Sequence, residues 1–461
     1  MTMNTYGDLG KIITLINKNI KKKTCDIYKV VTKKFPFAKY ELVNDIIQRI
    51  NKDGFESMNM NFRDYDNSFN INEVENTKIK VPAKYKKYEE QFQKLYATPQ
   101  PEQRTQEWFD YRYERITASD MATAIDLNPY ESVEAFICKK CNPNFPFLDG
   151  PAVFHGKKYE QIATQLYEHI YNNKVTEFGC VPSDKYKFLG ASPDGICSKA
   201  TLDNKFSPMV GTMLEIKCPA TRKITTVGKI AGEICPFYYY CQVQQQLECC
   251  DLDYCDFWQC EIIQYESRTE YLLDEDFKPV FSEGTNGEVK EIDTRWAKGC
   301  LLQFLPKVYE PTHDEDKHEY KSTYIYPPRL DMTQEEYDRW CLDTISNWYI
   351  YNPEMAENYY FDKIIYWKIP KSHNVKITRD TKWFNSIYPI LVDTWDKILY
   401  YRQHEDELPK LQKIADSRKR FYRMNTNFKV NNFKYGSLFI EPMKGEEESC
   451  NECGFTSDEE D

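Results

Sequence analysis

The amino-acid pattern predicts an α/β protein of the α+β type, with a central mixed sheet flanked by helices. Strand-like and helix-like segments alternate densely between residues 103 and 266, and apolar residues recur at helical spacing in the first 55 residues. The chain has 461 residues, of which 15% are aromatic, so it can bury a sizeable core and is not a disordered or fibrous protein. We expect a globular core with an added N-terminal helical unit and a C-terminal extension.

Changes in composition divide the chain into segments. An Asn-rich run, residues 56–76, has few core formers, the stretch after residue 268 is mixed and polar, and the chain ends in an acidic run. We therefore predict the following segments in chain order: a small basic helical domain (1–55), a linker (56–102), a core (103–268), an insertion (269–357), the remainder of the core domain (358–410), a basic C-terminal segment (411–444) and an acidic disordered tail (445–461).

Charge is distributed unevenly along the chain. The formal net charge is −11, but the tail after Lys444 contains acidic residues and no basic ones, whereas basic residues outnumber acidic ones in the first fifty. The overall acidity therefore does not exclude a nucleic-acid partner. No apolar run approaches about 18 residues, and the amino terminus lacks the apolar stretch of a secretory signal. We expect a soluble protein that is not secreted and that acts in a cytoplasm.

The sixteen cysteines are expected to be reduced thiols, because the sequence contains no export signal. Two pairs, Cys138 with Cys141 and Cys450 with Cys453, have the spacing of zinc ligands. A structural zinc site needs four ligands, however, and neither pair has an evident partner pair. Buried cysteines that serve as small apolar residues are the simpler interpretation.

Four polar positions lie in the densely patterned region. In a predicted helix at residues 156–168, Glu160 lies beside the apolar stripe and could lean over whatever the stripe packs on. Asp194 follows an apolar strand at a Pro-Asp-Gly turn. In the next strand, Glu215 and Lys217 share one face with period two. Taken singly, Glu160 could lie on a solvated helix face, Asp194 in a plain hairpin turn, and Glu215 with Lys217 on a cross-paired surface strand.

A further helix, at residues 238–247, precedes a strand at residues 256–265. Gln242 and Gln246 lie four residues apart on one face of this helix and could reach into a polar site. Together, the helix Glu, the turn Asp, the strand Glu-x-Lys and the helix Gln describe a divalent-metal site, because carboxylate oxygens suit Mg²⁺ or Mn²⁺ and disfavour zinc. The sequence offers no covalent nucleophile beside a base.

This arrangement resembles the PD-(D/E)xK nuclease superfamily and, within it, the YqaJ-like viral recombinase branch that includes phage lambda exonuclease. Pro193 and Asp194 form the PD pair, and residues 215–217 form the ExK triplet. Five blocks in the expected order, within residues 104–265, carry the resemblance: residues 108–119, 156–160, 192–195, 214–219 and 242–244.

The resemblance implies a restriction-endonuclease-like core and a role for each matching residue. Asp194, Glu215 and the carbonyl of Ile216 would bind metal, and Glu160 would hold a second ion or its waters. Lys217 would act as the catalytic lysine. Gln242 would be a further catalytic residue that orients the water or the lysine. The residues that would bind DNA and its terminal 5′-phosphate are Arg112, Thr117, Ser119, Ser192 and Arg222.

The function that the resemblance implies is metal-dependent exonuclease activity, 5′ to 3′ on linear double-stranded DNA, in viral-type recombination, repair or genome processing. It would use Mg²⁺ or Mn²⁺, with two ions, on DNA ends, alongside a single-strand annealing protein and in a homo-oligomer such as the trimer of the related phage enzyme. The expected place is the host cytoplasm or a viral replication site. Two alternatives are a non-catalytic DNA-binding scaffold and an iron–sulfur nuclease of the CRISPR-associated type.

The chain departs from the simplest family pattern in three ways. A polar stretch, residues 199–208, separates the PD and ExK motifs, and we expect it to loop out of the sheet edge without moving the strands. The helical head and the segment after residue 268 have no counterpart in the minimal phage enzyme. The acidic tail is particular to this chain.

Overall fold

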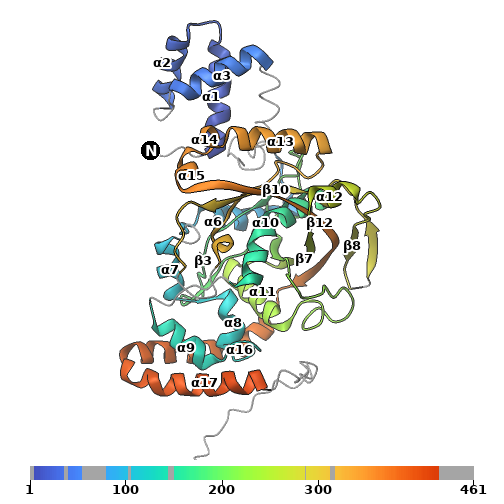
Figure 1. The fold of residues 1–461 in the computed structure, drawn as a ribbon. Helices are drawn as coiled ribbons and strands as arrows, with labels where there is room; N and C mark the ends of the chain where they lie inside the picture. The colour runs from blue at the N-terminus through green and yellow to red at the C-terminus, as the bar shows by residue number, and fades with distance from the viewer. Residues whose placement is uncertain are drawn as a thin grey trace, which may run out of the picture.

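The computed structural model, shown as a ribbon in Figure 1, describes residues 5–35, 40–53, 79–101, 105–143, 150–285, 287–311 and 317–424. The acidic tail, most of the segment 411–444 and the Asn-rich run lie outside these residues, so the predictions for them stay predictions. Among the helices that are described, none combines the length and the apolar character that a membrane span needs.

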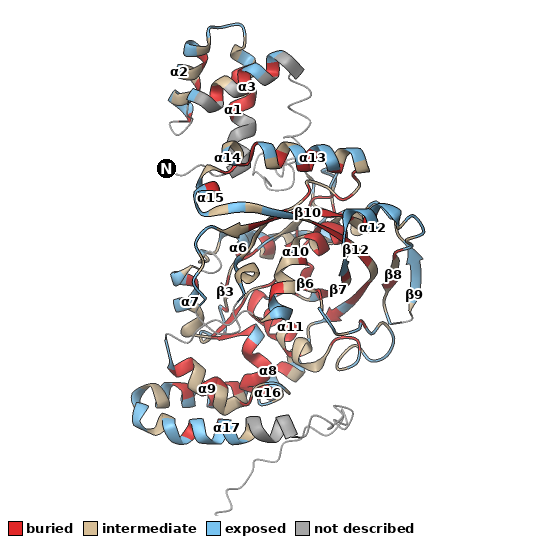
Figure 2. Ribbon diagram, in the orientation of Figure 1, coloured by how far each residue is buried: buried red, intermediate tan, exposed pale blue. Residues whose placement is uncertain are grey.

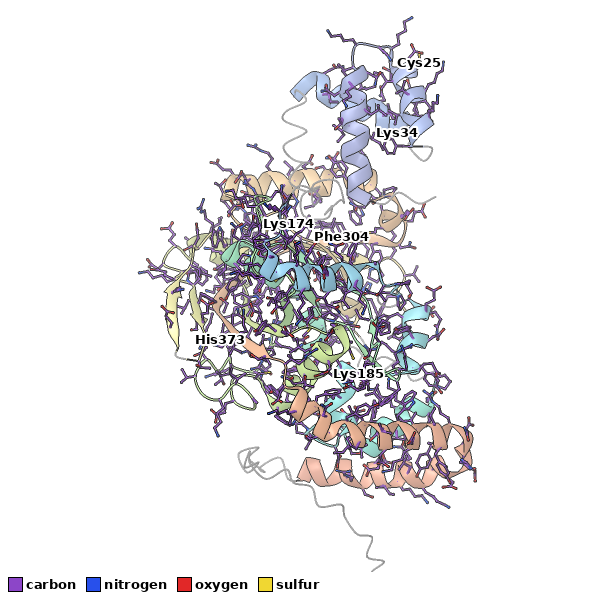
Figure 3. All side chains as sticks on the ribbon, turned by 180° about the vertical axis from the view of Figure 1, so that it is seen from behind. Cys25, Lys34, Lys174, Lys185, Phe304 and His373 are labelled. Carbon is purple, nitrogen blue, oxygen red and sulfur yellow. The ribbon has the colours of Figure 1, made fainter. Side chains whose placement is uncertain are left out.

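Where it is described, residues 5–35 and 40–53, the N-terminal unit has three helices, α1 (Thr5–Asn19), α2 (Thr24–Lys34) and α3 (Tyr40–Asp53), which confirms the helical prediction for this stretch. They enclose a separate small core in which Ile12, Ile16 and Val31 are fully buried. Tyr351 of helix α14 (Trp348–Tyr351) packs against this core. Figure 3 shows the unit from behind, with Cys25 and Lys34 in it, at the end of the molecule away from α16 and α17.

Helix α6 (Lys86–Ala97), preceded by the short helix η1 (Ala83–Tyr85), lies within the stretch 56–102 that the composition assigns to a linker. Phe92 and Leu95 of α6 are buried in the main core. This part of the stretch is therefore folded against the protein, because two large apolar residues at helical spacing give the helix a face to bury.

Within the described residues the central sheet has nine strands: seven in the order β11-β10-β12-β7-β6-β5-β2, then β8 paired with β12, and β9 paired with β8. Strands β6 and β7 are parallel, whereas β5 and β6, β7 and β12, and β12 and β10 are antiparallel. The sheet is therefore mixed, as predicted. Its strands are β2 (Val175–Thr176), β5 (Gly195–Cys197), β6 (Met213–Lys217), β7 (Tyr254–Gln264), β8 (Val280–Glu283), β9 (Glu288–Glu291), β10 (Lys298–Pro306), β11 (Thr323–Ile325) and β12 (Tyr359–Thr378).

A second, three-stranded sheet has the order β1-β4-β3. Its strands are β1 (Ile116–Thr117), β3 (Val181–Pro182) and β4 (Leu189–Ala191). Strands β1 and β4 are parallel, with Thr117 opposite Gly190. Because parallel strands end at the same edge of a sheet, the residues that follow β1 and those that follow β4 emerge side by side.

The two faces of strand β6 explain how the core is divided. Met213 belongs to a cluster with residues of α11 (Phe237–Cys250), whereas Leu214 and Ile216 belong to a cluster with residues of α10 (Pro151–Tyr171). Alternate residues of a strand point to opposite faces, so α11 covers one face of β6 and α10 the other. Figure 2 shows the buried strands and the buried faces of both helices.

The stretch 269–357 contributes strands β8 to β11 to the central sheet, with β10 paired along β12. It also carries helices α12 (Arg268–Leu273), η3 (His318–Lys321), α13 (Gln334–Ser346), α14 and α15 (Pro353–Asn358). Its core includes Phe304, which is stacked on Trp348 and is labelled in Figure 3. Whether this stretch is an insertion relative to smaller relatives stays a prediction.

The remaining helices lie mostly at the end opposite the N-terminal unit (Figure 1). Helices α16 and α17 both pack against α9, and α16 also packs against α8. The bounds are α7 (Gln106–Tyr113), η2 (Ala118–Asp120), α8 (Met121–Ala124), α9 (Val133–Cys141), α16 (Thr381–Gln403), η4 (Glu405–Glu407) and α17 (Leu408–Met424).

Trp258 on β7 joins helix α10 to the sheet, and its replacement tests this packing. The ring is fully buried, and its Nε1–H donates to the carbonyl of Ala163 at 2.9 Å. We expect Trp258→Ala to lower the free energy of unfolding by about 3–5 kcal/mol, through the cavity that it leaves. Urea denaturation measures this, with exposed Leu342→Ala as the control; equal midpoints for the two variants would contradict the prediction.

Candidate active site

Strand β5 leaves strand β6 at the point where the PD and ExK motifs meet. The two strands pair at Gly195 with Leu214 and at Ile196 with Met213, and the long connection between them lies outside this pairing, as predicted for the polar stretch. The pairing does not extend to the residue before Gly195. There the Asp194 carboxylate takes the place of a strand, and its Oδ2 accepts the N–H of Ile216 at 2.6 Å. The N–H and C=O of one strand residue point to the same edge, so the Ile216 carbonyl faces the same edge as Asp194.

Glu215 is fully buried, and three side chains donate to its carboxylate. Gln242 Nε2 donates to Oε1 at 2.7 Å, and Gln246 Nε2 donates to Oε2 at 2.7 Å. Lys217 Nζ also contacts Oε1. Burying a carboxylate without partners costs several kcal/mol, so these donors are what allows an acidic residue in the middle of this sheet.

Lys217 lies between its carboxylate partners and an aromatic ring. Its Nζ is 4.7 Å from the centre of the Tyr239 ring, a cation–π geometry. Burial alone would lower the pKa of Lys217, but the carboxylates of Glu215 and Asp194 raise the pKa above its ordinary value. The lysine is therefore held in its charged form.

Glu160 reaches the site from the other face of the sheet. It lies on α10, which packs with Leu214 and Ile216, whereas Glu215 points toward α11. No three His, Cys, Asp or Glu side chains of the described segments are grouped to hold a metal ion. Glu160, Asp194 and Glu215 therefore do not form the predicted three-carboxylate site in this arrangement. The physical reason is the alternation of β6, which turns Glu215 away from α10.

The charge balance at this edge nevertheless suits a divalent cation. Burial, together with the carboxylates of Glu215 and Glu160, raises the pKa of Asp194 well above its usual range, although Lys217 opposes the effect. The carboxylates of Glu215 and Glu160 thus both act on Asp194, and Lys217 offsets only part of their effect. Two carboxylates and the Ile216 carbonyl provide the hard oxygen ligands that Mg²⁺ and Mn²⁺ prefer, so the donor set fits such an ion.

Arg112 and Ser119, the predicted phosphate ligands, are in contact. Arg112 Nη2 donates to Ser119 Oγ at 3.2 Å, and its guanidinium lies 4.5 Å from the centre of the Trp108 ring. Trp108 is buried. The Thr117 hydroxyl lies 3.2 Å from that of Ser119. Together these side chains provide a forked cation and hydroxyl groups at one place, which is suitable for a phosphate.

Two buried charged residues that sequence reasoning missed hold this group in position. Lys140 Nζ donates to the carbonyls of Arg112 and Arg115, each at 2.8 Å, and lies 3.3 Å from Asp120 Oδ2. Asp120 Oδ2 also accepts the Thr117 hydroxyl at 2.7 Å. Burial opposes ionisation of Asp120, but the cations of Lys140, Lys139 and Arg112 lower its pKa below the ordinary range.

Helix α11 and the parallel strands β1 and β4 join the carboxylates to Arg112, Thr117 and Ser119, which we call the phosphate-ligand group. Gln245 Nε2 donates to the carbonyls of Ile116 on β1 and Gly190 on β4, at 2.9 and 3.1 Å. The neighbouring Gln246 donates to the Ser192 carbonyl at 3.2 Å as well as to Glu215. Helix α11 therefore positions both the carboxylates and the strands that lead to Arg112 and Ser119. The sequence predicts the contribution of Gln246, from its spacing with Gln242, but not that of Gln245.

The last two predicted residues lie at the border of the site. The Ser192 side chain is half-buried, two residues before Asp194. Arg222 is also half-buried, and its Nη2 donates to Gln259 Oε1 at 2.9 Å. Gln259 is the partner of Lys217 in the β6–β7 register, so Arg222 lies next to the ExK motif rather than in open solvent.

The described cysteines are all free thiols. Burial raises the pKa of Cys141 to about 11, and burial also raises those of Cys249, Cys255 and Cys260, so the thiolate that a metal binds is disfavoured. These cysteines provide no ligand set for the iron–sulfur alternative. Cys450 and Cys453 lie outside the described residues.

In this mixed α/β core, Asp194 of the PD pair meets the ExK triplet where strands β5 and β6 separate. Residues 107–253 match the model of the YqaJ-like viral recombinase domain. This part of the chain is therefore similar to the YqaJ-like viral recombinase domain, the branch of the PD-(D/E)xK nuclease superfamily that the sequence motifs resemble.

Two viruses encode proteins that are similar to this chain. An uncharacterized protein of Acanthamoeba polyphaga mimivirus is 40% identical over 319 residues, covering 69% of this chain and 56% of that protein. A protein of African swine fever virus is 27% identical over 167 residues, covering 32% of this chain and 46% of that protein. The chain thus spans about half the length of these relatives.

Among solved structures, an alkaline exonuclease from Laribacter hongkongensis matches with a TM-score of 0.33 and 16% identity. The match covers 68% of this chain and 99% of that one.

The two glutamines that bind Glu215 allow a matched prediction. Gln246 is fully buried and donates to Oε2, whereas Gln242 is half-buried and shares Oε1 with Lys217. We expect Gln246→Met to lower the free energy of unfolding by about 1–3 kcal/mol, and Gln242→Met to lower it by less, because Lys217 still serves Oε1. Urea denaturation of both variants tests this, and a larger loss for Gln242→Met would contradict it.

Proposed function

We propose that the protein is a metal-dependent deoxyribonuclease that degrades one strand of linear double-stranded DNA from its 5′ end. One observation carries the proposal: Asp194, Glu215 and Lys217 meet at the open edge of β6, inside a YqaJ-like domain. A decayed, non-catalytic relative would be expected to have lost a carboxylate or the lysine. The intact set therefore favours an enzyme over a scaffold.

In the proposed site, Asp194, Glu215 and the carbonyl of Ile216 would hold Mg²⁺ or Mn²⁺, and Glu160 would serve a second ion or its waters. A bound divalent ion lowers the pKa of water and offsets charge that develops on a phosphodiester. Lys217, which contacts Oε1 of Glu215, would orient the attacking water and stabilise the negative oxygens of the phosphate.

Gln242 and the phosphate ligands would complete the reaction site. Gln242 keeps Oε1 of Glu215 in place and orients Lys217 or the water. Arg112 and Ser119 would bind the 5′-phosphate of the strand being degraded, with Thr117 positioning Ser119. Ser192 and Arg222 would contact neighbouring phosphates. A site that holds the terminal phosphate selects an end rather than an internal position, which gives exonuclease activity its physical basis.

The biological role that we propose is recombination, repair or genome processing of viral type, in the host cytoplasm or at a viral replication site. A single-strand annealing protein would be the natural partner, because degradation from a 5′ end exposes a 3′ single strand. A homo-oligomer that encloses the duplex would keep the enzyme on its substrate. The viral relatives support this setting.

The central test of the activity uses purified protein and end-labelled linear duplex. We expect nucleotide release with Mg²⁺ or Mn²⁺, its loss with a chelating agent, and its return when Mg²⁺ is restored in excess. A strand labelled at its 5′ end should release the label at once, and one labelled at its 3′ end should release it late. Absence of release with every divalent ion would reject the enzymatic proposal.

Replacing the buried carboxylate separates catalysis from DNA binding. We expect Glu215→Gln to abolish turnover and to leave DNA affinity within about tenfold, because the change removes a metal ligand and not a phosphate contact. Single-turnover kinetics and fluorescence anisotropy measure the two effects. The variant would disagree with the assigned role if it kept more than about a tenth of the activity.

Replacing the proposed phosphate ligand tests end recognition. We expect Arg112→Ala to reduce the preference for 5′-phosphorylated over 5′-hydroxyl duplex, since it removes a forked cation from the phosphate. Arg112→Lys keeps the charge but not the paired N–H donors of the guanidinium. Its preference for 5′-phosphorylated duplex should therefore lie between those of the wild type and Arg112→Ala. The ratio of kcat/KM on the two substrates measures the preference. Equal rates of the wild-type protein on both ends would defeat this assignment.

A further inference from the structure

Tyr130 is a large aromatic residue whose ring is exposed beside the candidate site. Its side chain is 78% exposed, on the segment between helices α8 and α9. A single exposed aromatic residue is common on protein surfaces and by itself indicates nothing. The surroundings of Tyr130, however, connect it to both parts of the site.

On one side, Tyr130 begins a row of rings that ends at the catalytic lysine. Its ring lies edge-on to Tyr238, with the ring centres 5.7 Å apart, and the rings of Tyr238 and Tyr239 lie 4.3 Å apart. Tyr239 is the ring over which Lys217 lies, at 4.7 Å. The inner end of the row therefore contacts the ExK motif, and the outer end is open.

On the other side, the residue next to Tyr130 is tied to the phosphate-ligand group. Glu131 Oε2 lies 3.7 Å from Lys139 Nζ, and the same Nζ lies 3.8 Å from Asp120 Oδ1. Asp120 in turn holds Thr117, which contacts Ser119. Tyr130 is thus connected, through its neighbours, to the proposed phosphate ligands and to the lysine.

The segment that carries Tyr130 is braced. Arg418 of α17 donates to both carboxylate oxygens of Asp126, at 3.0 and 2.8 Å, and to those of Glu134, at 3.0 and 2.8 Å. The backbone N–H of Tyr130 donates to Asn128 Oδ1 at 3.0 Å, a local turn that fixes the chain at this point. A ring held in place before binding loses little freedom when a ligand covers it.

We propose that Tyr130 is a stacking platform for a nucleobase at the 5′ end of the DNA, so that base stacking and phosphate binding together hold the terminal nucleotide. This inference rests on the proposed function and adds to it a residue that recognises the base rather than the phosphate. Stacking is open to every base, because each has an apolar face. The contact would therefore add affinity for an end without adding sequence preference.

The experiment is a double-mutant cycle between Tyr130 and the terminal base. Binding of wild type and Tyr130→Ala is measured in EDTA, where the proposed metal-dependent cleavage is stopped, to two 5′-phosphorylated duplexes: one intact, and one with an abasic 5′-terminal nucleotide. On the intact duplex we expect Tyr130→Ala to weaken binding by about 5- to 100-fold. On the abasic duplex, wild type and variant should bind with the same Kd.

Two further variants serve as controls. Tyr130→Phe keeps the ring and should bind within about twofold of wild type. Tyr349→Ala removes a similarly exposed tyrosine of α14, 67% exposed, and should change nothing. Far-ultraviolet circular dichroism checks that Tyr130→Ala is folded, and the abasic duplex tests the same contact without any change to the protein.

Each remaining outcome overturns the inference. No loss for Tyr130→Ala on the intact duplex means that no base stacks on this ring. Equal losses on intact and abasic duplexes mean that Tyr130 contacts something other than the terminal base. Failure of the proposed function would show separately, as absence of Mg²⁺-dependent nucleotide release by the wild-type protein.

Discussion

Burial of the Glu215 carboxylate in the central sheet governs the arrangement of everything around it. A fully buried carboxylate is tolerable only where donors surround it, and here two come from helix α11 and one from Lys217, two residues further along its own strand. Helix α11 must therefore present Gln242 and Gln246 to this face of β6. Gln245 of the same helix donates to the carbonyls of Ile116 on β1 and Gly190 on β4. The helix that stabilises the buried Glu215 carboxylate therefore also positions the phosphate-ligand group.

The split between β5 and β6 determines where a ligand can enter. A strand that continued along β6 would occupy the edge of Ile216 and leave no room for an ion or a phosphate. Because the chain turns at Asp194, its carboxylate satisfies the Ile216 N–H, and the neighbouring carbonyl is left facing the same edge. Burial and the carboxylates of Glu215 and Glu160 raise the pKa of Asp194, and Lys217 only partly opposes this. A divalent cation at this edge would relieve the repulsion among these carboxylates.

Much of the core could be predicted from local pattern. The alternation of Met213 to Lys217 is sufficient to separate the two faces of the strand, and the spacing of Gln242 and Gln246 is sufficient to put both amides on one helix face. The contributions of Lys140, Asp120 and Tyr130 could not be predicted in this way. Lys140 is bound to backbone carbonyls more than twenty residues away, and no periodicity in the chain reports such a contact.

The order and type of the residues were enough to predict the chemical groups of the candidate site. These are the carboxylate oxygens, the amine of Lys217, and the guanidinium of Arg112 with its neighbouring hydroxyl groups. Local rules suffice for this, because helix and strand periodicity depend on near neighbours. Folding of the whole chain was needed to bring Glu160 and Glu215 in from opposite faces of the sheet and to add the strands of segment 269–357 to it. Those outcomes follow from which distant strands pair, and pairing is set by the packing of the entire core.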